Sequence, residues 1–350
     1  MNRIFNIGLL LLFLVQVGVS AQRDLSRHHQ TKFDEYLASS IEKLSISNRH
    51  GMIHYTGWDK DTLAIRVSIW VEAPNSEMAT EVHEQINISQ QPVGDSLDYR
   101  TSFEENFFSN FAFGIDYHIF GPRHLALELR NLLGDITLEE YNGSASLTAE
   151  YGNLTITKNA VAMPKAIIQV TNGDLTIGDL QKAEITHKNG QLQIKHVGEL
   201  SLISDFSTAT INRVEKMNLR ATTGKMNIGQ AGSVNLTTKR TDIVISELRQ
   251  HGFIESQRGR IQIQSVHRSL QELTLAGDLT PIELQLADDL PFNLHGQVTN
   301  GQFIYPEKKK IRTLKENNTL SFSGAYNSKN KTVPNFIIFN KNSDIQLITK

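Results

Sequence analysis

The chain has no cysteine, so neither disulfide bonds nor thiolate metal sites can contribute to its stability. It has little excess of either charge, because 35 Lys and Arg face 37 Asp and Glu for a formal net charge of −2. No nucleic-acid partner is expected, since a basic footprint is missing. The densest basic run, residues 308–310, follows Pro306 in a turn-like stretch and is interpreted as a solvated loop.

The sequence also lacks the short motifs of common enzymes and metal sites. It has no Gly-x-Ser-x-Gly elbow, no His-Glu-x-x-His helix, no phosphate-binding glycine loop and no EF-hand spacing. His28 and His29 are adjacent, so their side chains face different ways on a helix or a strand. A flexible linker is favoured there over a metal pair, and no metal or cofactor is predicted.

Only one long apolar run is present, at residues 7–19. It follows Arg3 and ends in Val19-Ser20-Ala21, small residues suited to cleavage before Gln22. The run is shorter than a typical membrane span and indicates a secretory signal peptide at residues 1–21, with a retained signal anchor as the alternative. We expect an exported protein in the periplasm, at the cell surface or outside the cell. A polar linker is expected at residues 22–43.

A short pattern recurs between residues 134 and 301: a Gly or small polar residue, then apolar residues two and four positions later. Each copy alternates apolar and polar residues with period two, which is typical of a half-buried strand and not of a helix. The copies begin 17 residues apart, and the last two 18 apart, at Gly173, Gly190, Ser207, Gly224, Thr241, Gly259 and Gly277.

The apolar positions form columns when the copies are aligned. Leu175 and Ile177 begin one pair of columns, and Ala183 and Ile185 begin a second pair later in the same copy. One copy cannot bury its apolar side alone, whereas copies stacked at the ~4.8 Å strand spacing bury continuous columns. Helical repeats need about 33 residues and propeller blades about 40, so this period favours a β-solenoid.

The predicted fold is therefore all-β: a single-stranded parallel β-solenoid (β-helix) of about 17–18-residue coils with a small α+β N-terminal cap. The cap and first strands are expected at residues 44–125, with one short helix at 75–86, and the solenoid with C-terminal capping strands at 126–350. The Gly that opens each coil is expected either to adopt a positive φ or to have no room for a side chain.

An aromatic group falls within the predicted cap. It is interpreted as core beneath that cap, because a solenoid must cover its end strand against edge-to-edge aggregation. Its members are Phe107, Phe108, Phe111 and Phe113.

The segment Asn48-Arg-His-Gly51-Met-Ile-His-Tyr-Thr-Gly57-Trp58-Asp59 resembles the opening of the bacterial secreted putative-adhesin family. Residues 131–138, 150–156 and 171–177 resemble that family's recurring glycine-plus-strand coil, and the likeness covers roughly residues 44–350. The resemblance implies an exported β-solenoid whose motifs are structural, with no catalytic residues to carry over. The chain departs from the pattern at Ser207 and Thr241, which puts those two turns in question.

One outward column carries mostly uncharged polar residues that would suit a glycan or a partner protein. We call it the polar strip and treat it as the candidate ligand-facing surface, although any soluble solenoid needs polar outward residues. It consists of Thr176, Gln193, Thr210, Asn227 and Gln262.

No column places carboxylates on adjacent coils. Asp174 and Asp242 share a column but lie four coils apart, roughly 19 Å at the strand spacing. His187 and His196 fall in different columns and are interpreted as residues of solvated turns.

Two hypotheses follow for function. The leading one is a noncatalytic exported β-solenoid, an adhesin, scaffold or binding module at the bacterial envelope, whose partner is an envelope protein or a polysaccharide. The alternative is a β-helix carbohydrate-active enzyme, a polysaccharide lyase or glycosidase, with its carboxylates brought together from the caps.

Overall fold

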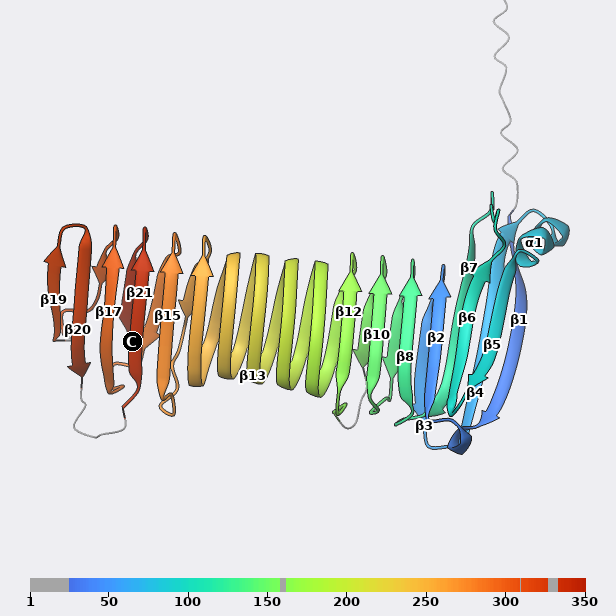
Figure 1. Cartoon of the computed structure of the whole chain (residues 1–350), viewed down its shortest axis with the longest axis horizontal. Coiled ribbons are helices and arrows are strands. Elements are labelled where there is room, and N and C mark those ends of the chain that lie inside the picture. The colour runs from blue at the N-terminus through green and yellow to red at the C-terminus, as the bar shows by residue number, and fades with distance from the viewer. Residues whose placement is uncertain (1–24, 158–161, 309, 327–332) are drawn as a thin grey trace, which may run out of the picture.

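The computed structural model describes residues 25–157, 162–308, 310–326 and 333–350. These residues form an elongated all-β protein in which the strands lie side by side along the long axis (Figure 1). The predicted signal peptide, residues 1–21, lies outside the described residues. The single α-helix in the described part of the chain is α1 (Ser76–His83), and a short 3-10 helix, η1, covers Ala38–Ser40.

The strands are, in chain order, β1 (Ser26–Leu37), β2 (Lys43–Arg49), β3 (Ile53–Trp58), β4 (Thr62–Ala73), β5 (Ile86–Val93), β6 (Ser96–Phe103), β7 (Phe113–Pro122), β8 (Ala126–Leu132), β9 (Ile136–Glu139), β10 (Ala145–Glu150), β11 (Leu154–Thr157), β12 (Ala166–Thr171), β13 (Leu175–Gln257), β14 (Arg260–Ile263), β15 (Glu272–Asp278), β16 (Ile282–Leu286), β17 (Phe292–Thr299), β18 (Phe303–Ile304), β19 (Ile311–Glu316), β20 (Thr319–Tyr326), β21 (Asn335–Lys341) and β22 (Ile345–Thr349).

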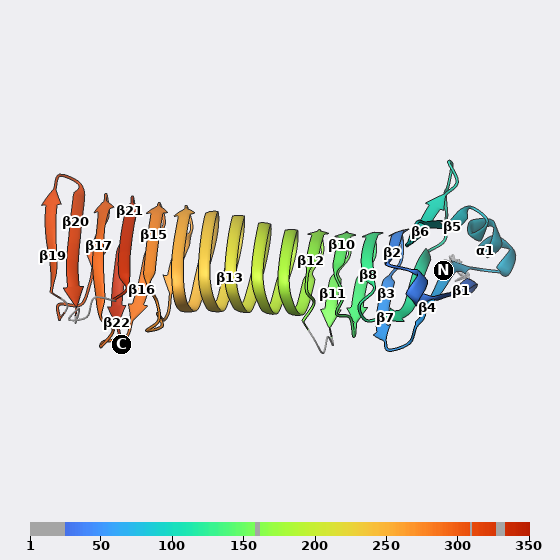
Figure 2. The same cartoon turned by 60° about the horizontal axis from the view of Figure 1, so that its bottom comes forward.

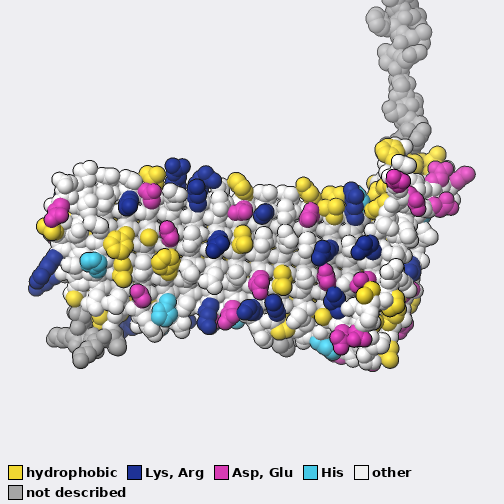
Figure 3. Space-filling view, viewed as in Figure 1, with side chains coloured by type: hydrophobic (Ala, Val, Ile, Leu, Met, Phe, Trp, Pro, Cys, Tyr) yellow, Lys and Arg dark blue, Asp and Glu magenta, His cyan; other side chains and the backbone are white. Residues whose placement is uncertain are grey.

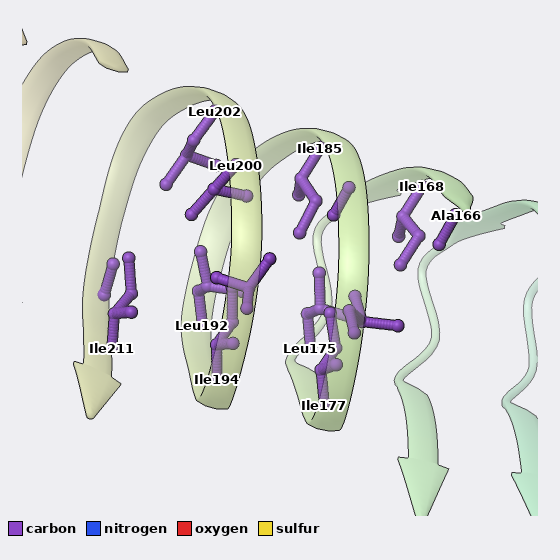
Figure 4. Close-up of a cluster of buried hydrophobic side chains, with 14 of the residues drawn as sticks. Ala166, Ile168, Leu175, Ile177, Ile185, Leu192, Ile194, Leu200, Leu202 and Ile211 are labelled. Atoms are coloured by element: carbon purple, nitrogen blue, oxygen red, sulfur yellow. The ribbon is translucent and has the colours of Figure 1, made fainter. Parts of the chain in front are cut away.

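The repeated segment winds through successive turns. β13 runs unbroken for 83 residues, and its ribbon passes round the long axis several times (Figures 1 and 2). Apolar residues that recur every 17 positions stack inside these turns, and Ile177, Ile194 and Ile211 all point inward (Figure 4). The residues just before them, such as Thr210, are exposed. The period-two alternation of the sequence therefore sets which side chains reach the core.

Parallel pairing joins each turn to the next on both sides of the core. On one side β10 lies between β8 and β12, with Leu147 opposite both Leu129 and Ile168. On the other side β11 lies between β9 and the start of β13, with Leu154 opposite both Ile136 and Leu175. The apolar columns thus face one another from two walls across a continuous core.

The parallel pairing predicted for the repeat does not extend to the two ends, where strand orientation is mixed. β1–β4, β4–β7 and β5–β6 pair antiparallel near the N-terminus, as do β17–β20 and β19–β20 near the C-terminus. For β5–β6 and β19–β20 the physical reason is the short connection, because a two-residue hairpin joins consecutive strands only in the antiparallel orientation. Gly94 and Asn317 adopt positive φ in two such turns.

The spatial order of the strands also differs from the chain order at both ends. β2 pairs with β6 on one side and β8 on the other. β21 likewise lies between β15 and β17, and β22 lies between β16 and β18. Gly277, which was expected to open a turn, instead lies in β15 opposite Ser256, and Thr280 opens that turn at the position that corresponds to Gly259. The turns that begin at Thr280 and Gly301 follow each other in sequence, yet the last turn of the chain separates them.

Residues 22–43, expected to be a polar linker, contain β1. This strand pairs with β4 along its whole length, from Ser26 opposite Ala73 to Leu37 opposite Thr62. A polar strand suits this position because β1 pairs with β4 alone among the described strands and exposes its other edge.

The aromatic group in the N-terminal region is only partly core. Phe107 packs on Phe103 and Phe113, with ring centroids 4.6 and 5.1 Å apart, and Phe111 is partly buried against the core. Phe108 is 70% exposed, so its assignment to the core is wrong.

The turns show why glycine recurs. At most of these glycines the residue before the Gly takes the positive φ, as Leu133 and Asn189 do at 61° and 56°, whereas at Gly277 it is Leu279 that does. The Gly itself has no room for a side chain, because a Cβ on Gly134 would lie 1.8 Å from the carbonyl oxygen of Gly51 in the neighbouring turn. Of the two expected reasons for glycine, lack of space is the one that applies at this position.

Candidate functional site

The polar strip predicted from the sequence lies on the wall that contains β11, β14 and β16. Thr176, Gln193, Thr210 and Asn227 are exposed on β13. Gln262, on β14, is half-buried, and its Nε2 donates to Glu283 Oε1 over 3.1 Å. The strip therefore exists as an outward column, but Val244 interrupts it between Asn227 and Gln262.

A more enclosed surface lies on the other wall. A groove of about 740 Å³ follows the long axis across three successive turns of β13 and then across β15, β21 and β17. We call it the axial groove. Figure 3 views this wall, on which apolar side chains and charges of both signs are interspersed among polar groups.

The axial groove lies between two outward columns of side chains. Each strand contributes one residue to the first column, one to the second, and the inward residue between them, as with Glu255, Ser256 and Gln257. The first column is Arg220, Thr237, Glu255, Ala276, Phe339 and Gln297, and the second is Thr222, Lys239, Gln257, Asp278, Lys341 and Thr299.

The insertion of the last turn completes this groove. Phe339 on β21 lies opposite Ala276 of β15 on one side and Gln297 of β17 on the other. Phe339 is 43% exposed, so a large part of its ring is open to solvent in a groove lined mainly by polar side chains. The groove is therefore lined by residues of the central repeat at one end and by residues from the C-terminal end of the chain at the other.

The charges of the groove fall into groups along its length. Arg220 and Lys239 lie on neighbouring turns of β13 and on opposite columns. Glu255 and Asp278 follow on the next two strands, again on opposite columns, and Lys341 comes after them on β21.

Most of these charged side chains are not engaged by the protein itself. Asp278 Oδ1 accepts a hydrogen bond from Asn342 Nδ2 over 2.9 Å. Within the described ranges, no ion pair or side-chain hydrogen bond occupies Arg220, Lys239, Glu255 or Lys341. These four groups are therefore available to a ligand.

Glu255 and Asp278 revise the expectation about carboxylates. Among the described residues of the groove, neither column holds carboxylates on adjacent strands, but Glu255 in the first column and Asp278 in the second lie on two neighbouring strands. Asp174, by contrast, has a structural role, because its Oδ1 accepts the backbone N–H of Gln191 in the next turn over 2.8 Å.

The interpretation of His187 as a solvated turn residue is wrong. Its side chain is fully buried, with Nε2 3.0 Å from the carbonyl oxygen of Gly173 and Nδ1 2.9 Å from Ser207 Oγ. Burial lowers the pKa of His187 by desolvation, partly opposed by the Gly173 carbonyl and by Asp174. The hydroxyl of Ser207 thus enters a buried polar cluster at a turn where the repeat expects glycine.

His196 differs from His187 in being half-buried near carboxylates. Its Nδ1 lies 3.7 Å from Asp179 and its Nε2 lies 3.9 Å from Glu215. Among the residues that the structure describes, no group of three or more His, Asp or Glu side chains is arranged to hold a metal ion. In the same residues, no helix has the length and apolarity needed to span a membrane.

The chain matches no protein-family model and no curated protein. Solved structures similar to it include a putative cell adhesion protein from Clostridium sporogenes, at 10% identity and a TM-score of 0.22 over 92% of this chain and 100% of that one. A putative lipid binding protein from Parabacteroides distasonis has 10% identity and a TM-score of 0.35 over 91% and 96%. A putative adhesin from the same species has 9% identity and a TM-score of 0.33 over 91% and 97%.

At these low identities and TM-scores, the similar structures do not establish the fold or the function of this chain. The geometry of the axial groove is the observation from which a function can be argued.

Proposed function

We propose that the chain is a noncatalytic, exported β-solenoid module that binds an extended polymer at the bacterial envelope, as an adhesin or a scaffold. The observation that carries this proposal is the direction of the axial groove. It runs along the stack and crosses a new strand at every ~4.8 Å, or about 24 Å over its five strand intervals. A linear ligand can follow such a path, whereas a compact one would contact only part of it.

The chemistry of the groove supports the same proposal. Amide groups, hydroxyl groups and unpaired charges line it, and Phe339 adds an exposed ring. Binding sites commonly combine such an apolar surface with a few polar groups that fix orientation. Repetition of modest contacts along a polymer also gives useful total affinity without any single deep pocket.

Export is part of the proposal and rests on the apolar run at residues 7–19 and the small residues before Gln22. Intact-mass measurement of the protein from the envelope or the medium tests it. We expect a species that begins at Gln22, and a species that begins at Met1 would contradict cleavage.

Polymer binding can be measured by retardation of the purified protein in native gels that contain polygalacturonate, dextran or a soluble β-glucan. The groove variant carries Phe339→Ala and Gln297→Ala, two neighbours in one column. The matched control carries Gln193→Ala and Asn227→Ala in the polar strip. We expect the groove variant to weaken binding by about fivefold or more, while the control retains it.

Loss of binding in the control alone would identify the polar strip as the ligand surface. If none of these polymers, and no extended peptide of similar length, binds the unmodified protein, the proposed function is wrong.

A second candidate function, a glycosidase, is favoured by one observation. Glu255 and Asp278 lie on neighbouring strands, on opposite sides of the groove in which a glycan would lie. Glycosidases place two carboxyl groups on either side of the bond they cleave, one as acid and one as base or nucleophile. An activity measurement separates this candidate from the binding module.

A further inference from the structure

We infer that the ligand of the axial groove is an acidic glycan whose sugar units carry carboxylates, with one such carboxylate held between Arg220 and Lys239. This inference rests on the proposed function and names the class of polymer. It goes beyond that proposal, because a neutral glycan or a peptide would equally satisfy polymer binding.

The spacing of the groove favours a glycan over a peptide. Its rows of side chains recur at ~4.8 Å along the axis, which is close to the length of one pyranose unit in an extended chain. An extended peptide instead presents side chains on one face about every 6.6 Å, from a rise of ~3.3 Å per residue. A glycan therefore stays in register with successive strands, whereas a peptide drifts out of register within a few residues.

The charge pattern favours an acidic glycan over a neutral one. Arg220 and Lys239 approach the groove from opposite columns on neighbouring turns, so a carboxylate lying between them would meet a cation on each side. Neither side chain has an ion-pair partner within the described part of the chain. A guanidinium and an ammonium without protein partners at one end of a binding groove suit an anionic group of the ligand.

The rest of the groove suits the neutral parts of the same chain. Glu255 can accept hydrogen bonds from sugar hydroxyls, and Phe339 offers an exposed ring to the C–H face of a pyranose. Lys341 lies two residues after Phe339 on the same strand and can meet a second carboxylate. Cations at both ends with acceptors between them therefore match a glycan in which carboxylates recur at intervals of several strands.

Titration calorimetry of the full chain with three hexameric probes tests the inference: hexagalacturonate, cellohexaose and hexaglutamate. These represent an acidic glycan, a neutral glycan and an acidic peptide. We expect hexagalacturonate to bind most tightly, and its affinity to fall as salt is raised from 0.05 to about 0.5 M because screening weakens contacts between exposed charges.

The variant Arg220→Gln/Lys239→Gln removes both cations and keeps the hydrogen-bonding capacity and bulk of the side chains. We expect it to bind hexagalacturonate about tenfold less tightly, and cellohexaose unchanged. Lys188→Gln is the matched control, because Lys188 is an exposed lysine of the same wall, on β13 opposite Thr171 and outside the groove.

Three results would overturn the inference. The first is binding of hexagalacturonate no tighter than that of cellohexaose. The second is an equal affinity for hexagalacturonate in the double variant and in the control. The third is binding of hexaglutamate as tight as that of hexagalacturonate. If hexagalacturonate binds no more tightly than cellohexaose but cellohexaose binds measurably, the proposed polymer binding stands and only the preference for an acidic glycan is wrong. Failure of all polymers and all three probes removes both.

Discussion

At the residue scale, a shift of one position along a strand decides whether a side chain meets the core or water. Ile211 is fully buried between the turns that carry Ile194 and Ile228, and Thr210 beside it is exposed. Ile211→Asp places an unpaired carboxylate in an apolar column and should lower the free energy of unfolding by at least ~3 kcal/mol. Thr210→Asp should change it by roughly 0.5 kcal/mol or less, because its side chain stays in solvent.

Urea melts of the two variants measure this contrast. Equal losses, or a larger loss at Thr210, would show that the register of the repeat is wrong, since a one-residue shift reverses the facing of every side chain in a strand.

The buried imidazole of His187 makes stability depend on pH. Desolvation lowers its folded-state pKa below the ordinary value of 6.5. Well above pH 6.5 the ring is neutral in both states and contributes no pH dependence. As the pH falls, the unfolded chain takes up the proton first, so the free energy of unfolding decreases until the pH passes the folded-state pKa.

Melts between pH 8 and pH 5 test this effect in the unmodified protein and in His187→Asn. Asn is a suitable replacement because the inward column already holds Asn131 and Asn340. His50 and His83, whose pKa values burial also lowers, contribute equally to both proteins. We expect a shallower loss of stability toward pH 5 in the variant, and parallel curves would contradict the role of His187.

At the element scale, the insertion of β21 and β22 both orders the C-terminal end and completes the groove. Removal of residues 333–350 takes away β21, which β15 and β17 share, and β22, which β16 and β18 share, together with Phe339 and Lys341. It leaves two long strand edges without partners, and such edges pair with other chains. We expect the truncated protein to form oligomers or aggregates and to lose binding to polygalacturonate.

Size-exclusion chromatography with light scattering measures the oligomeric state of the truncated protein. Replacement of Leu314, an exposed residue of β19, by Ser is the control for a change at the same end of the molecule. A truncated protein that stays monomeric and binds as before would contradict the importance of the inserted turn.

The same insertion marks the limit of what the sequence can predict. Pairing within the repeat is local, because Leu175 and Leu192 are related by one period, and this makes the strands and their buried faces readable from the sequence. β21 pairs with distant strands instead: Asn335 lies opposite Glu272 and Asn293, which are 63 and 42 positions earlier in the chain. Neither separation matches the period of the repeat. The repeat therefore predicts the central turns and the polar strip, whereas Phe339 can be placed in the axial groove only once this distant pairing is known.

Turn chemistry was predictable in kind but not in detail. The need for glycine at positions such as Gly134 follows from the close approach of neighbouring turns. The replacement of glycine by Ser207 has no local signal, because its partner is the imidazole of His187 on another turn, 20 residues away. Buried polar contacts between turns depend on which turns stack in three dimensions. The period alone does not show which residues can replace glycine at a turn.

At the scale of the whole molecule, the architecture separates the core, which determines stability, from the surface proposed to bind the ligand. The core lies between two walls of strands, while the charges of the axial groove lie on the outside of one wall. Substitutions in the groove should therefore leave folding intact, because surface positions usually change stability by less than about 0.5 kcal/mol. This separation allows groove variants to be interpreted as tests of function.

The choice between a binding module and a glycosidase depends on whether the molecule turns over a glycan that it binds. We expect no release of reducing ends from polygalacturonate, dextran or a soluble β-glucan, because Asp278 is engaged by Asn342 and Glu255 is exposed to solvent. In glycosidases, burial or a neighbouring charge instead raises the pKa of one carboxyl group so that it can act as an acid.

Reducing-end assays of the unmodified protein, Glu255→Gln and Asp278→Asn decide the matter, with Glu199→Gln as a control at an exposed carboxylate outside the groove. Turnover that either groove substitution abolishes, and that the control retains, would make this protein an enzyme and reverse the proposal.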